Sequence, residues 1–145
     1  MEVHSIVKKV LHTEGHAILA CADRLSAEPG RAALQSAIGV LRDALDSGGK
    51  IIVTGLGKSG KVAQKVAATL SSMGSLSVYL HPTEGLHGDL GMVQTRDAVL
   101  AMSHSGNTEE LVRLMPAFRS RGIPVVGLGG NPDSTLARQC TAWID

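Results

Sequence analysis

Short runs of β-branched and other apolar residues alternate with stretches of helical periodicity through the last two-thirds of the chain. We expect a strand in each of five runs: 51–54, 76–80, 98–102, 124–128 and 141–144. Between them, apolar residues recur three and four positions apart around 62–73 and 109–121, which is typical of helices. Strands that alternate with helices build a parallel sheet. The sequence therefore predicts an α/β fold, a three-layer sandwich on a five-stranded parallel sheet.

Two further helices are expected ahead of the sheet, at 3–27 and 31–46, separated by Pro29 and Gly30. We treat the whole chain as a single domain, with leading helices at 1–47 and the α/β core at 51–145. The connection at 81–92 has no clear period and is long for a compact domain. Another helix is predicted to begin at Asn131 and Pro132, before the last strand.

Composition excludes several classes of function. The chain has 145 residues and a net charge of +1, so it offers no basic surface for nucleic acid. Only 2% of its residues are aromatic, which removes the stacking surface that single-stranded nucleic acid needs. No apolar run approaches the ~20 residues that cross a bilayer, and the two cysteines form no disulfide framework or metal cluster. We expect a cytoplasmic protein with neither nucleic-acid nor membrane partners.

The loop at 55–60 carries a G-x-G-x-x-G pattern between the first strand and a helix. This pattern also occurs in dinucleotide sites, but the next strand ends at Leu80 and His81, without the acidic residue that would hold a ribose. A nicotinamide-dependent oxidoreductase therefore stays an alternative on the glycine motif alone. Backbone N–H groups at a helix N-terminus, with the groups of Lys58 and Ser59, form an anion site. The alternative is a glycine-rich turn whose Lys58 points into water.

The loop at 103–108 brings three hydroxyls, those of Ser103, Ser105 and Thr108, to the end of a strand and the start of a helix. Hydroxyls suit a phosphate monoester because they donate hydrogen bonds without adding charge, while the helix end supplies partial positive charge. The alternative is that Ser105 or Thr108 merely caps the helix. We expect the loops at 55–60 and 103–108 to grip one phosphoryl group together.

Ser-x-Ser-Gly-x-Thr after a strand, with Gly-x-Gly-x-Ser one βα unit earlier, resembles the SIS (sugar isomerase) fold of phosphosugar-binding domains, a flavodoxin-like arrangement. His-Pro-x-Glu-x-x-His-Gly-Asp-Leu-Gly at 81–91 narrows the resemblance to D-arabinose-5-phosphate isomerases. The resemblance covers 51–145, with the leading helices where the family has them. Two departures are Thr83, where the family often has Gly, and Asn107, where many members have Glu.

The resemblance implies an aldose–ketose isomerase that interconverts D-arabinose 5-phosphate and D-ribulose 5-phosphate for Kdo and lipopolysaccharide synthesis. It implies no cofactor and a homodimer or homotetramer. Such chemistry passes through an enediolate and needs a base, an electrophile and a phosphate handle. Carried over by position, the catalytic residues are Lys58, Glu110 and His87. The substrate-binding residues that we predict are Gly57, Ser59, Ser103, His104, Ser105, Gly106 and Thr108.

Each catalytic assignment has an alternative. Glu110 is the expected base, or else a solvated carboxylate in a first helical turn, where it is already favourable. Lys58 is the expected electrophile. His87 serves ring opening or sugar hydroxyls, or is a structural loop histidine. His81, His87 and His104 belong to loops at one sheet edge, but their spacing is not a zinc pattern, and no required metal is expected.

The family continues past the fifth strand through a helix that carries a glutamate and a histidine of the active site, often followed by a pair of CBS domains. The sequence ends at Asp145. We therefore expect part of the catalytic set to be missing from the chain as given. The alternative function is a non-catalytic module that senses a sugar phosphate with the same loops.

Overall fold

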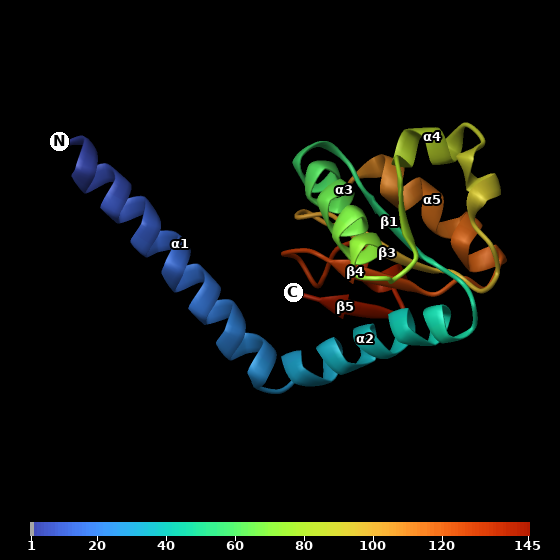
Figure 1. Cartoon of the computed structure of the whole chain (residues 1–145), viewed down its shortest axis with the longest axis horizontal. Helices are drawn as coiled ribbons and strands as arrows, with labels where there is room; N and C mark the ends of the chain where they lie inside the picture. The colour runs from blue at the N-terminus through green and yellow to red at the C-terminus, as the bar shows by residue number, and fades with distance from the viewer. Residues whose placement is uncertain (1) are drawn as a thin grey trace.

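Five strands form one parallel sheet in the computed structural model, which describes residues 2–145 (Figure 1). Along the sheet the order is β2-β1-β3-β4-β5, and every neighbouring pair is parallel. The strands are β1 (Ile51–Gly55), β2 (Ser77–Leu80), β3 (Ala98–Met102), β4 (Val125–Leu128) and β5 (Ala142–Ile144). The predicted five-stranded parallel α/β fold is confirmed, and strand boundaries differ from the predicted runs by at most one residue.

Helices cover both faces of the sheet and produce the three layers. Helices α2 (Gly30–Asp46) and α3 (Gly57–Ser72) pack on one face, where Val53 shares a cluster with Ala63 and Ala67 of α3. Helices α4 (Pro82–Leu86) and α5 (Glu109–Ser120) pack on the other face, and there Ile52 belongs to a cluster with Leu111 and Leu114 of α5. Neighbouring residues of one strand thus reach opposite layers, which makes β1 a fully buried strand.

Helix α1 (Val3–Ser26) projects away from this core (Figure 1). It contacts α2 near its C-terminal end and has no buried residue. The two predicted leading helices are confirmed. Apolar side chains along α1, such as Leu11 and Ile18, are 62% and 70% exposed. None of the helices in residues 2–145 has the length and hydropathy needed to cross a membrane.

Two connections differ from the sequence expectation. The stretch at 81–92 has no clear period in the sequence but contains α4 and a 3-10 helix, η1 (Asp89–Met92). Five residues are too few to show a helical period, although Pro82 stands at a position that favours a helix start. The helix predicted from Asn131 is wrong. Asn131 Oδ1 accepts a hydrogen bond from the Asp133 N–H at 3.0 Å and turns the chain locally, and a single 3-10 helix, η2 (Ala137–Gln139), follows.

Candidate functional site

The strand order places the first two glycine-containing loops at the point where the sheet changes direction. From β1 the chain crosses to β2 on one side and then to β3 on the other. Sheets of this order bind ligands beyond the carboxyl ends of the strands at such a point. The loops after β1 and β3 both begin there, because Gly55 pairs with Met102 at the end of the ladder. Ser59 and Ser103 therefore lie at the same edge of the sheet.

Gly55 is the closest meeting point of these two loops. A Cβ at Gly55 would lie 3.0 Å from the Met102 carbonyl oxygen and 3.1 Å from the Ser59 carbonyl group. Met102 directly precedes Ser103, so the end of β3 and the first turn of α3 approach one another across a gap that is one glycine wide. This close approach is the geometric basis for treating the two loops as one site.

The β1–α3 turn leaves the start of α3 open. Leu56 is the N-cap residue, and no side chain in residues 2–145 donates or accepts a cap hydrogen bond for this helix. Gly57 has φ +59°, a conformation that glycine adopts without strain. Lys58 is exposed and Ser59 is half-buried. The first-turn N–H groups of α3 therefore form an anion-attracting end.

The β3–α5 loop is held by its own hydroxyls. Ser103 is 3% exposed, and its Oγ accepts a hydrogen bond from the Gly106 N–H at 3.1 Å. The same Oγ lies 2.8 Å from Thr108 Oγ1. Thr108 stands at the N-cap of α5 but makes no side-chain cap bond. Ser105 is exposed, and its Oγ accepts the Asn107 N–H at 3.2 Å. The cap alternative is therefore not what the Thr108 hydroxyl does in this structure.

The other predicted site residues surround these loops at different depths. Glu110 is half-buried in the first turn of α5. His104 is exposed, and its ring would lie 3.0 Å from a Cβ at Gly130, so it packs against the β4–β5 connection. His87 is exposed at the C-terminal end of α4, which follows β2. Within residues 2–145 no three His, Cys, Asp or Glu side chains gather as a metal site.

Sequence reasoning missed a role for Tyr79. Its phenol lies beside the β1–α3 turn and donates a hydrogen bond to the Gly55 carbonyl at 2.8 Å. Burial raises the pKa of the phenol, and side-chain hydrogen bonding with Gln64 opposes the rise. In the sequence, Tyr79 belongs only to a strand end without an acidic residue, which carries no signal for such a contact. Burial also raises the pKa of the Cys140 thiol to about 11, so this cysteine is not a nucleophile at neutral pH.

Comparison with known proteins agrees with this geometry. The SIS domain family model matches residues 45–145. The chain belongs to the SIS domain family. The arabinose 5-phosphate isomerase KdsD of Pseudomonas aeruginosa is 41% identical, over 77% of this chain and 40% of the relative. The arabinose 5-phosphate isomerase GutQ of Salmonella typhi is 43% identical, over 67% of this chain and 30% of the relative.

The SIS chain spans less than half the length of these curated relatives. Among solved structures, the E. coli CFT073 protein c3406, in complex with a sugar phosphate, superposes with a TM-score of 0.81. That protein is 31% identical, and the match covers 100% of this chain and 74% of the other. The resemblance to the SIS family and to arabinose 5-phosphate isomerases that the loop motifs indicated is confirmed.

Proposed function

We propose that this SIS domain binds D-arabinose 5-phosphate and D-ribulose 5-phosphate and takes part in their interconversion. The observation that carries the proposal is the Gly55 contact, which joins an open helix start to a hydroxyl-lined loop at the β1/β3 edge. Relatives that are named arabinose 5-phosphate isomerases support the choice of sugar. The free cysteines Cys21 and Cys140 suit a cytoplasmic setting.

The phosphate is held by neutral donors. Ser59, Ser105 and Thr108 supply hydroxyls, while α3 and α5 supply first-turn N–H groups. Ser103 works beneath them. Because its Oγ already accepts the Gly106 N–H, Ser103 donates its proton to Thr108, and the Thr108 proton is then free for a phosphate oxygen. Gly57, His104 and Gly106 shape the rim of the same cradle.

The isomerisation moves one proton between adjacent carbons of the open-chain sugar. Glu110 removes the proton from C2 of the aldose, and the electron pair forms the C1–C2 double bond of an enediolate. Lys58 stabilises the oxygen that gains negative charge. Return of a proton to C1, with loss of the proton on the C2 oxygen, yields the ketose. His87 transfers the proton that opens the sugar ring. The steps need no hydride acceptor.

A non-catalytic phosphosugar sensor is the second candidate. Lys58 is exposed, and Glu110 lies where a solvated carboxylate is already favourable, while the hydroxyl loop is the more buried and better hydrogen-bonded part of the site. Binding without turnover would suit that arrangement. The two functions share the cradle and differ only in what Lys58 and Glu110 do.

One assay separates these functions. D-ribulose 5-phosphate is incubated with the protein and D-arabinose 5-phosphate is followed, together with binding titrations for the sugar phosphate and NAD. Glu110→Gln should abolish turnover. Glu109→Gln is the matched control, because Glu109 is an exposed first-turn carboxylate paired with Arg113 at 2.8 Å. Tight sugar binding without turnover supports the sensor, and NAD binding of equal strength would favour an oxidoreductase instead.

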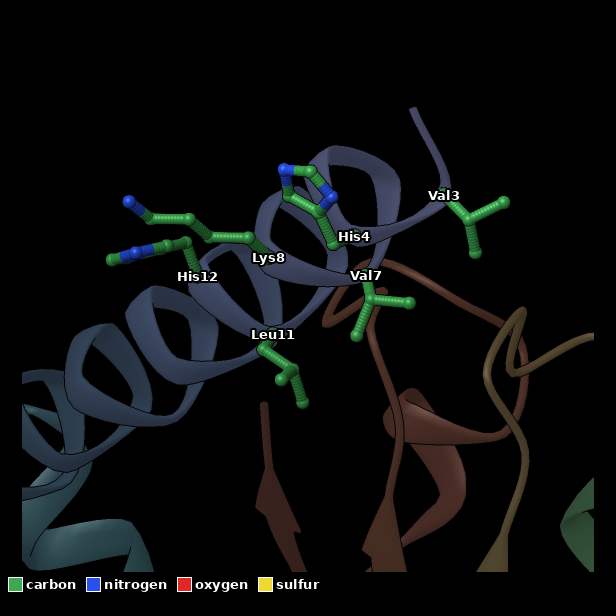
Figure 2. Close-up of a pocket in the computed structure, with 6 residues that line it drawn as sticks. All are labelled: Val3, His4, Val7, Lys8, Leu11 and His12. Carbon is green, nitrogen blue, oxygen red and sulfur yellow. The ribbon is translucent and has the colours of Figure 1, made fainter. Parts of the chain in front are cut away.

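We also propose that the protein is a homo-oligomer that uses α1 as a contact. Figure 2 shows Val3, Val7 and Leu11 along one side of this helix, with His4, Lys8 and His12 along another. Val3 is 76% exposed and Leu11 is 62% exposed. Apolar side chains at this spacing form a stripe that a second helix can cover.

A further inference from the structure

The side chain of Tyr79 reaches from β2 to the turn that begins α3. Its Oη donates a hydrogen bond to the carbonyl oxygen of Gly55, the last residue of β1, at 2.8 Å. The register between β1 and β2 ends at the pair of Thr54 and Leu80. The phenol therefore joins the two strands one residue beyond their backbone ladder, on the side of the proposed site.

The same hydroxyl also contacts the other end of the turn. A Cβ at Gly60 would lie 3.1 Å from Tyr79 Oη and 2.7 Å from the Gly55 carbonyl oxygen. Gly60 is buried, and its N–H donates to the Leu56 carbonyl at 3.2 Å. Tyr79 thus touches both glycines that bracket Lys58 and Ser59, the two side chains that this turn offers to a phosphate.

We propose that Tyr79 is a positioning residue of the phosphosugar site, whose hydroxyl fixes the β1–α3 turn so that Ser59 and the first-turn N–H groups are aligned before the phosphate arrives. This inference rests on the proposed function. A turn that is already ordered loses less conformational entropy on binding, so affinity rises without any new contact to the ligand. Because burial raises the pKa of the phenol, Tyr79 stays protonated and remains a donor.

Tyr79→Phe removes only the hydroxyl and tests the proposal by calorimetric titration with D-arabinose 5-phosphate. We expect the dissociation constant to rise about threefold to tenfold, the range for one lost hydrogen bond. Ser77→Ala is the matched control. The Ser77 Oγ lies on the same strand and donates to the Ala67 carbonyl of the same helix at 2.7 Å, but at the opposite end of β2 from the site. It should lower thermal stability and leave the dissociation constant unchanged.

A double-mutant cycle asks whether Tyr79 acts through the turn. In a Ser59→Ala background, Tyr79→Phe should raise the dissociation constant by a smaller factor than in the wild-type background, since the group that it aligns is gone. Equal factors in the two backgrounds would overturn the proposal. So would an unchanged constant for Tyr79→Phe, or equal losses of affinity for Tyr79→Phe and Ser77→Ala.

Hydrogen exchange of the unliganded protein tests the same idea without a sugar. Tyr79→Phe should speed exchange of the Gly60 amide, whereas Ser77→Ala should not. If the wild-type protein fails to bind the sugar phosphate, the proposed function fails and the link to that site fails with it. If the protein binds but the Gly60 amide exchanges at its wild-type rate in Tyr79→Phe, the positioning role is excluded and the proposed function stands.

Discussion

The hydroxyls of the β3–α5 loop have different surroundings, so they are expected to have different roles. Ser103 is buried and bonded to Gly106 and Thr108, while Ser105 is exposed and accepts only the N–H of Asn107. A buried hydroxyl that holds a loop contributes to stability, because its removal leaves partners unsatisfied. An exposed hydroxyl contributes little to stability and is free for a ligand. Motif spacing treats the two serines alike, and only burial distinguishes them.

Ser105→Ala and Ser103→Ala should therefore separate affinity from stability. We expect Ser105→Ala to weaken sugar-phosphate binding about tenfold, with a change in unfolding free energy within about 0.5 kcal/mol. Ser103→Ala should weaken binding and also lower the unfolding free energy by about 1–3 kcal/mol. Urea unfolding and calorimetric titration measure the two quantities. Ser120→Ala, at the far end of α5, is the control, and an unchanged dissociation constant for Ser105→Ala would contradict the cradle.

At the scale of elements, the sequence predicts best what depends on long patterns. The β-branched runs located all five strands, and the apolar stripes located α1, α2, α3 and α5. Short elements escaped, because α4 has five residues and no period to detect. The helix expected from Asn131 failed since its side chain satisfies a backbone N–H locally. The site loops were found from residue type and strand order, whereas the role of Tyr79 depends on a side-chain contact between β2 and the end of β1.

The start of α3 depends on a glycine at position 60. A Cβ there would lie 2.7 Å from the Gly55 carbonyl oxygen, and backbone cannot move aside cheaply. Gly60→Ala should lower the unfolding free energy by about 1–3 kcal/mol, as overpacking does. Gly39→Ala in α2 is the control, because a Cβ there meets nothing within 4 Å. It should raise stability by about 0.5–1 kcal/mol, the helix-propensity gain. A neutral Gly60→Ala in thermal unfolding would contradict the close approach.

The opposite edge of the sheet is fixed by a buried ion pair. Asp97 has no exposed side-chain surface, and its Oδ2 lies 2.7 Å from Lys50 Nζ. Its oxygens also accept the N–H groups of Lys50 at 2.9 Å and Gln94 at 2.8 Å. Asp97→Ala should lower the unfolding free energy by about 3–5 kcal/mol, because Lys50 and two N–H groups lose their partner. Where the variant remains folded, sugar-phosphate affinity should match the wild type. A loss of affinity would link this edge to the site.

At the scale of the whole molecule, α1 is the element that the single chain does not explain. A helix of 24 residues with no buried side chain gains nothing from the core, and isolated helices are marginally stable in water. Its ordered apolar stripe therefore indicates a partner surface, which we assign to a second copy. The SIS core, from β1 to β5, has its own hydrophobic clusters on both faces of the sheet and does not need α1 to bury them.

Changing the apolar side of α1 should therefore alter assembly and leave the fold intact. Val7→Ser with Leu11→Ser removes two exposed apolar side chains from the side drawn in Figure 2. We expect light scattering after size exclusion to show a shift from oligomer to monomer, while circular dichroism keeps its sheet signal, because neither residue packs in the core. His4→Ser with His12→Ser changes the other labelled side and should leave the oligomer unchanged. A wild-type protein that is monomeric at high micromolar concentration would exclude this use of α1.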